Sequence, residues 1–100
     1  MKEINSHIDQ IKMLCHLYKV KSLFAFGSVT RDDFKKSSDV DLIVEIEDHD
    51  PLSYSDNYFN LKFQLENILH RHIDLLEQKT LKNPYLKAEI DSTKVLVYGS

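Results

Sequence analysis

The sequence predicts an α/β (α+β) fold in which a small mixed sheet of about four strands packs against helices. Apolar residues recur at helical spacing in some segments and alternate with polar residues in others. Two Xaa-Pro pairs mark helix starts. Helical segments separate the strand-like segments, as in sheets whose strands are joined through helices. With 100 residues, the chain is expected to form one domain over residues 1–100.

The first elements are a helix and a strand. Residues 3–18 carry apolar side chains at helical spacing, which predicts one amphipathic helix. Its apolar face would contain Ile4, Ile8, Ile11, Leu14, Cys15 and Tyr18. Residues 22–26, SLFAF, form a short apolar run that ends at Gly27, and we interpret this run as a buried strand.

Residues 39–47 alternate between apolar and polar side chains, which predicts a half-buried strand. One face would carry Val40, Leu42, Val44 and Ile46, and the other Asp39, Asp41, Ile43, Glu45 and Glu47. Asp50 and Pro51 then predict the N-cap and the first residue of a helix that runs to about Leu69. We expect Leu52, Phe59 and Phe63 on its buried face, with Leu61, Leu65 and Ile68 as further candidates.

The last segments repeat the alternation of strand and helix. Residues 71–76, RHIDLL, predict a third strand. Asn83 and Pro84 predict the start of a short helix that reaches about Ile90. Residues 94–98, KVLVY, predict a final strand before Gly99.

Composition excludes several classes of function. The net charge is −3, so stable nucleic-acid binding is not expected, because phosphate neutralisation needs clustered Lys and Arg. No run approaches the roughly 18–20 apolar residues of a membrane span, and no secretory leader is visible. We therefore expect a cytoplasmic protein. Cys15 is the only cysteine, and we interpret it as a small buried hydrophobe.

The first candidate site feature is the pair Gly27 and Ser28 at the end of the buried strand. Glycine supplies the backbone freedom that a tight turn needs and lets another group approach the backbone closely. A short helix over residues 28–31 would leave free N–H groups that suit a phosphate. Taken alone, the pattern is more typical of an ordinary turn.

The second feature is Asp39-Val40-Asp41. On a strand, the two Asp side chains project from one face, with Cα atoms ~6–7 Å apart. Adjacent like charges are unfavourable unless a cation or solvent compensates them. Such oxygen ligands suit Mg²⁺, and two carboxylates can serve two ions in displacement at phosphorus. For the triplet alone, a solvated strand start is an equal alternative.

The combination is more specific. Ten residues separate Gly27-Ser28 from Asp39-Val40-Asp41, and this spacing resembles the signature of the DNA polymerase beta-like nucleotidyltransferase superfamily. The stretch FGSVTRDDFKKSSDVDLIVEIE looks most like the minimal nucleotidyltransferases, which are often encoded beside a HEPN-domain partner as a toxin–antitoxin pair. HIDLL and the ending NPYLKAEI…VLVY also resemble that family, so the likeness covers nearly the whole chain.

The resemblance implies roles for six residues. Gly27 and Ser28 would hold the triphosphate of a nucleotide. Asp39, Asp41 and Asp74 would be catalytic and would ligate the metal ions, with a solvated strand residue as the alternative for Asp74. Arg31 would contact phosphate oxygens, with a surface Arg as the alternative. Asp32 and Asp33 depart from the family, which often has Gly after this Arg, and they leave the loop geometry open.

The resemblance also implies the reaction. The chain would transfer AMP from ATP, with two Mg²⁺ ions, to a hydroxyl of a HEPN ribonuclease toxin, most readily a tyrosine. It would thereby act as the antitoxin. One alternative is a catalytically silent antitoxin that neutralises its toxin by binding. Another is a transferase that acts on a small molecule or on tRNA, although such relatives usually carry an additional domain for the acceptor.

Overall fold

The computed structural model describes residues 1–32 and 34–99. The helices within these residues are α1 (Lys2–Asn5), α2 (Ile8–Leu17), α3 (Pro51–Leu69) and α4 (Pro84–Thr93). The strands are β1 (Val20–Phe26), β2 (Val40–Ile46), β3 (Ile73–Glu77) and β4 (Val95–Gly99). Two short 3₁₀ turns, η1 (Gly27–Thr30) and η2 (Gln78–Thr80), follow β1 and β3.

The sheet is mixed, in the order β3-β2-β1-β4. β1 pairs antiparallel with both β2 and β4, whereas β2 and β3 run parallel because α3 carries the chain back between them. The predicted helix starts are confirmed. Asp50 accepts a hydrogen bond from the Ser53 backbone N–H, and Asn83 accepts from two N–H groups of the first turn of α4. The predicted α/β fold with about four mixed strands is therefore confirmed.

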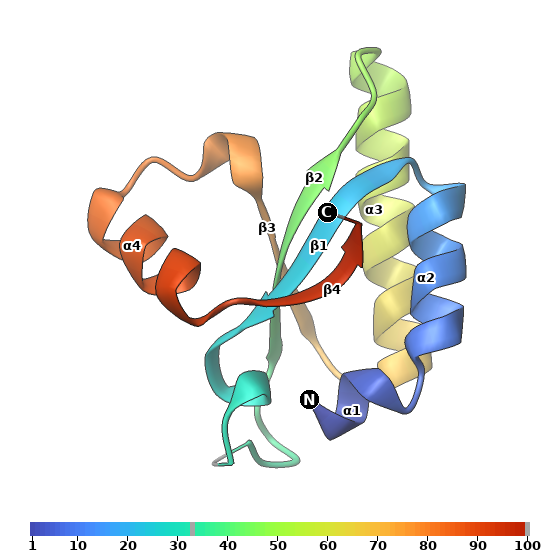
Figure 1. Cartoon of the computed structure of the whole chain (residues 1–100). Coiled ribbons are helices and arrows are strands. Elements are labelled where there is room, and N and C mark those ends of the chain that lie inside the picture. Colours follow the sequence, from blue (N-terminus) through green and yellow to red (C-terminus); the bar gives the residue numbers. More distant parts are fainter. Residues whose placement is uncertain (33, 100) are drawn as a thin grey trace.

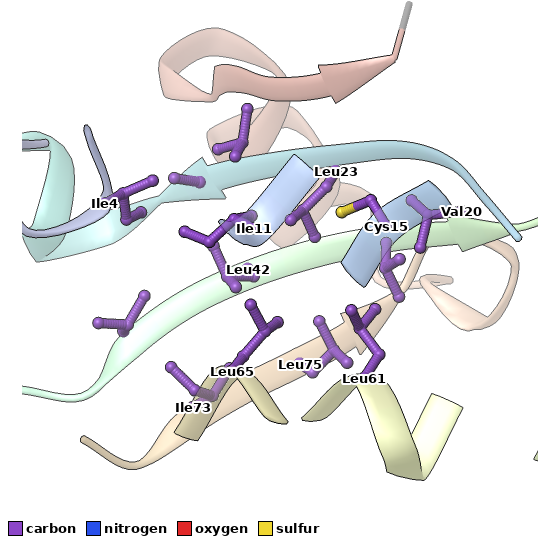
Figure 2. Close-up of a cluster of buried hydrophobic side chains, with 14 of the residues drawn as sticks. Ile4, Ile11, Cys15, Val20, Leu23, Leu42, Leu61, Leu65, Ile73 and Leu75 are labelled. Carbon is purple, nitrogen blue, oxygen red and sulfur yellow. The ribbon is translucent and has the colours of Figure 1, made fainter. Parts of the chain in front are cut away.

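The helices divide between the two faces of the sheet. Figure 1 shows α1, α2 and α3 on one side of the sheet and α4 on the other. The main core lies on the three-helix side (Figure 2), where side chains from these helices meet the inward residues of the strands. Cys15 belongs to this core and is fully buried, and burial raises the pKa of its thiol to about 12. The interpretation of Cys15 as a small hydrophobe is confirmed.

β2 departs from the predicted half-buried pattern at one residue. Val40, Leu42 and Val44 face the main core as expected. Ile43 points the opposite way and is nevertheless 1% exposed, as is Ile90 of α4. Because α4 covers part of the second face, the middle of β2 is buried on both sides, and only its ends present polar side chains to solvent or to a ligand.

The predicted helix over residues 3–18 is wrong in one respect, because it is broken in two at Ser6 and His7. The Ser6 hydroxyl donates to the Glu3 carbonyl, a local bond that competes with helix continuation. His7 then has non-helical dihedral angles, with φ −121° and ψ 21°. The break lets Ile4 and Ile11 both reach the core from helices that run in different directions (Figure 1).

The predicted buried face of α3 is also wrong in part. Leu52, Phe59 and Phe63 are exposed, at 79%, 50% and 58%. The residues of α3 that are buried are Leu61, Leu65 and Leu69, of which the first two were candidates. Ile68 is partly buried.

Two tyrosines explain why a different face of α3 from the predicted one turns toward the sheet. The Tyr54 hydroxyl donates to Glu77 Oε2 at 2.6 Å, and the Tyr58 hydroxyl donates to the Leu75 carbonyl. These bonds tie the tyrosine stripe of α3 to β3. Apolar side chains occur on both sides of α3, so periodicity did not distinguish the two faces.

No helix among residues 1–32 and 34–99 combines the length and apolar character needed to cross a membrane.

Candidate functional site

The predicted turn at the end of β1 requires glycine. Gly27 has φ +72°, a backbone conformation that side chains rarely adopt. A Cβ added there would lie 2.6 Å from Oδ2 of Asp41. The group that approaches the Gly27 backbone closely is therefore a carboxylate of the neighbouring strand, which β1–β2 pairing brings opposite Phe26.

The turn continues as a short helix, which begins at Gly27 and is 3₁₀ in type. The Thr30 hydroxyl donates to the Gly27 carbonyl at 2.7 Å, and the Arg31 N–H donates to the Ser28 carbonyl at 3.0 Å. These bonds fix the turn and leave Ser28 half-buried beside the strand end. Val29 anchors the turn because it is buried in the main core.

The sheet brings two predicted carboxylates directly together. Asp41 on β2 and Asp74 on β3 are register partners in the parallel pair. Their neighbours Val40, Leu42, Ile73 and Leu75 face the main core, so both carboxylates project from the opposite face. Tertiary pairing thus places residues 41 and 74 side by side, which the sequence separation alone does not specify.

The surroundings of Asp41 disfavour its charged form. Its pKa is raised, first by partial burial, then by the charges of Asp74 and Asp39, and the nearby Arg31 lowers it in part. Asp39 lies just before β2, and its carboxylate Oδ2 is 3.4 Å from Nδ1 of His72. The Asp39 side chain is more than half exposed, at 57%.

A pocket of about 200 Å³ adjoins this cluster. Phe26, Gly27, Arg31 and Asp41 line it from the β1–β2 side. The opposite wall is α4, which contributes Leu86, Glu89, Ile90 and Thr93. The pocket therefore combines an apolar part, a cation and two acids.

Sequence reasoning assigned no site role to α4. The signal was available, because residues 86, 89, 90 and 93 recur at the spacing of one helical face. That pattern predicts a buried face, but it does not say what the face covers. The structure shows that this face closes the pocket beside Gly27 and Asp41.

The predicted site residues are only partly gathered by the pocket. Gly27, Arg31 and Asp41 line it, whereas Ser28, Asp39 and Asp74 do not. Asp32 is exposed, and Asp33 lies outside the described residues. The side chains of Lys35 and Lys36 are exposed.

The carboxylates fit a hard divalent cation by their chemistry. Asp39 and Asp74 both raise the Asp41 pKa, after partial burial, so the negative charge of each lies close enough to act on the Asp41 carboxylate. Such a set is stabilised by a cation such as Mg²⁺. In the part of the chain that the structure describes, however, no three Asp, Glu, His or Cys side chains are grouped as a ready cation site.

Known proteins share the sequence and the fold. Residues 8–97 match the family described as "Nucleotidyltransferase domain". The chain is similar to two Methanocaldococcus jannaschii proteins that are each named "putative protein adenylyltransferase". One is 38% identical over 86 residues, which span 86% of this chain and 85% of the relative. The other is 37% identical over 87 residues, with the same two coverages of 86% and 85%.

Solved structures agree on the fold. One described as "putative minimal nucleotidyltransferase" superposes with a TM-score of 0.77 at 24% identity, over 94% of this chain and 92% of that one. A toxin–antitoxin structure with AMP-PNP gives 0.71 at 20% identity, over 93% and 73%. A tri-AMPylated Shewanella oneidensis HEPN toxin in complex with MNT antitoxin gives 0.65 at 18% identity, over 96% and 72%.

The match to the family spans most of the chain, and it includes the Gly27 turn and the three aspartates Asp39, Asp41 and Asp74. The minimal nucleotidyltransferase fold predicted from the sequence is confirmed by the structural match. The chain belongs to the nucleotidyltransferase domain family, and its sequence-based assignment as a nucleotidyltransferase is confirmed.

Proposed function

We propose that this chain transfers AMP from ATP, with Mg²⁺, to a tyrosine hydroxyl of a HEPN-domain toxin and so acts as its antitoxin. One observation carries the proposal. Asp41 lies against the Gly27 backbone, beside Asp74 in register, with a pKa raised first by partial burial and then by two neighbouring carboxylates. A folded protein that keeps such a repulsive cluster beside a pocket is suited to bind cations together with an anionic substrate.

Each site residue has a proposed role. Gly27 and Ser28 would receive the triphosphate at the turn, and Arg31, which lines the pocket, would contact its oxygens. Asp39, Asp41 and Asp74 would hold the Mg²⁺ ions. Bound Mg²⁺ would supply neutralisation of the triphosphate charge and of the departing pyrophosphate.

The proposed reaction is a displacement at the α-phosphorus of ATP. The acceptor hydroxyl oxygen forms a bond to that phosphorus, and the bond from phosphorus to the oxygen bridging to the β-phosphate breaks. Pyrophosphate leaves with the bridging oxygen. The hydroxyl proton passes to a carboxylate, for which we propose Asp74, because it is exposed beside Asp41 and open to an incoming acceptor.

The acceptor has to come from another molecule. The site pocket is only about 200 Å³, which leaves no room to enclose an acceptor as well as a nucleotide. Curated relatives named as protein adenylyltransferases support a protein acceptor. The AMPylated HEPN toxin in a structure of similar fold supports a toxin of that class. Added AMP would place a bulky anion where a ribonuclease binds phosphate, which would block RNA cleavage.

Intact-mass spectrometry would test this proposal. The product of the neighbouring gene is incubated with this chain, Mg²⁺ and ATP, and the control is the Asp39→Asn, Asp41→Asn double variant. We expect a mass increase in steps of AMP that the double variant does not produce. An unchanged mass together with a stable complex would contradict the enzymatic proposal and would favour an antitoxin that acts by binding.

Protection of cells gives an independent readout. If toxin silencing requires AMP transfer, the double variant will fail to rescue cells that express the toxin. Full rescue by the double variant would contradict the antitoxin mechanism, although it would leave the transferase chemistry to be measured separately.

A further inference from the structure

The three proposed metal ligands are not held in the same way. Asp41 and Asp74 are inside the β2–β3 ladder, where backbone hydrogen bonds fix both Cα positions. Asp39 precedes β2 and has no position in either ladder of that strand. The position of the Asp39 carboxylate therefore depends on what orders residues 34–39, together with the contact of its Oδ2 with His72 Nδ1 at 3.4 Å.

Arg71 holds this segment in place by donating hydrogen bonds to several of its carbonyl groups. Its Nη1 lies 2.8 Å from the Lys35 carbonyl oxygen, 3.1 Å from that of Lys36 and 3.2 Å from that of Ser38. The guanidinium carbon also lies 4.4 Å from the centroid of the Phe34 ring. One side chain thus contacts four of the five residues that precede Asp39.

The segment has the shape that these contacts need. The Ser38 N–H donates to the Lys35 carbonyl at 3.0 Å, and the Lys35 N–H donates to the Ser38 hydroxyl at 3.2 Å. This tight turn directs several carbonyls toward one point. Arginine suits that point because its charge strengthens each hydrogen bond and its planar group stacks on an aromatic ring.

His72, the residue just before β3, holds the chain on the other side of Asp39. The Val40 N–H donates to the His72 carbonyl at 3.1 Å. The Arg71 contact to the Ser38 carbonyl comes immediately before Asp39, and the His72 contact comes immediately after it. The peptide groups on both sides of Asp39 are therefore hydrogen-bonded to residues 71 and 72, which lead directly into the strand that carries Asp74.

We propose that Arg71 is a positioning residue, which sets the distance of the Asp39 carboxylate from Asp41 and Asp74 by gathering the carbonyls of residues 35–38. The inference rests on the proposed function only in taking Asp39 as a metal ligand. Nothing in it depends on which nucleotide or acceptor is used. Residues that orient a metal ligand typically change metal affinity by roughly 10–100-fold when they are removed.

A titration of the ¹⁵N-labelled chain with Mn²⁺, followed by paramagnetic broadening of backbone amide signals, tests the proposal without turnover. In the unmodified chain we expect amides next to Asp39, Asp41 and Asp74 to broaden together. In Arg71→Ala, the same amides should still broaden, because Asp41 and Asp74 keep their places in the sheet. The Mn²⁺ concentration at half-broadening should nevertheless rise roughly tenfold, because Asp39 no longer lies where it can complete the site.

Two further variants separate positioning from charge. Arg71→Lys keeps the charge and can donate to the same carbonyls, so it should restore part of the Mn²⁺ affinity while losing the stacking on Phe34. Lys82→Ala removes an exposed cation before α4 and should titrate like the unmodified chain. Dispersed spectra of each variant establish that it is folded.

The proposal is overturned if folded Arg71→Ala gives the same Mn²⁺ titration as the unmodified chain. It is also overturned if Mn²⁺ never broadens signals near Asp39 in the unmodified chain. Failure of the proposed function looks different, because transferase assays would then show no AMP transfer while the Arg71-dependent Mn²⁺ titration remained.

Discussion

The two ends of β2 hold aspartates in opposite electrostatic states. At the first end, Asp41 faces Asp74 and Asp39, and partial burial together with these charges raises its pKa. Beyond the last end, the Asp48 side chain is only 7% exposed. It nevertheless accepts hydrogen bonds from the Ser53 hydroxyl, the Asn57 amide and the Asp50 N–H.

The Asp48 hydrogen bonds favour its charged form. The Ser53 bond and then the Asp50 N–H are the main causes that lower the Asp48 pKa, and Lys19 contributes at 3.7 Å. Asp48 thus stabilises the fold by joining β2 to α3, whereas the charge of Asp41 opposes folding. The protein supplies hydrogen-bond donors to Asp48, which has a structural role, whereas for Asp41, as a proposed metal ligand, we expect the bound cation to supply most of the compensation.

The largest effect on this contrast is expected from Asp39→Asn combined with Asp41→Asn. Because the charge that would bind metal is removed, AMP transfer should fall by at least roughly a thousandfold. The melting temperature should be equal or higher, since repulsion near Asp74 is relieved. Initial rates from intact-mass spectrometry and a thermal melt measure both. Activity within tenfold of the unmodified chain would remove Asp41 from the proposed site.

The second-largest effect is expected from Gly27→Ala, which should lower the free energy of unfolding by about 1–3 kcal/mol. The substituted residue must adopt φ +72°, and its Cβ would meet Oδ2 of Asp41 at 2.6 Å. Urea unfolding measures the loss. The matched control adds Asp41→Ala in a double-mutant cycle. That change should recover the part due to contact and leave the part due to φ, and no recovery at all would mean that the two residues are not in contact.

Asp48→Asn should lower stability and leave AMP transfer unchanged. The neutral side chain loses the charge that strengthens the bonds from Ser53 and Asp50 and the attraction to Lys19. The urea midpoint should fall relative to the unmodified chain. Asp56→Asn, at an exposed position of α3, is the matched control and should leave the midpoint unchanged. An equal midpoint for the Asp48 variant would contradict the assigned structural role.

The smallest effect is the pH dependence of stability, and it should have opposite sign at the two ends. The raised Asp41 pKa means that the folded protein holds its proton longer, so this charge costs stability above the raised pKa and ceases to do so as pH falls toward the ordinary value. Asp41→Asn should therefore be the more stable form at neutral pH, and its advantage should vanish in acid.

Asp48 has the reverse linkage. Its lowered pKa gives stability that is fully present above the ordinary value and is lost as pH falls through the lowered one. The difference in unfolding free energy between the unmodified chain and Asp48→Asn should therefore persist to lower pH than the corresponding difference for Asp41→Asn. Urea unfolding at a series of pH values measures both differences. If the two differences vanished at the same pH, the opposite pKa shifts of Asp41 and Asp48 would be contradicted.

Local chemistry made most of the fold predictable. Asp50-Pro51 and Asn83-Pro84 act within one turn of their helices, so their capping follows from neighbouring residues alone. The Gly27 turn was likewise predictable from a glycine that ends an apolar run, and the strand with Asp41 from the alternation of apolar and polar residues. The buried face of α3 was not predictable in this way. Apolar residues occur around much of that helix, and the bonds of Tyr54 and Tyr58 to β3 select which ones face inward.

By itself, the sequence determined the order of elements, the glycine turn and the pair Asp39 and Asp41, because each depends on residues close together in the chain. Only the tertiary structure decided that Asp74 lies beside Asp41, that α4 closes the pocket and that Arg71 gathers the segment before Asp39. These contacts join residues more than 30 positions apart, and they follow from how the strands pair and how the helices pack rather than from any local pattern.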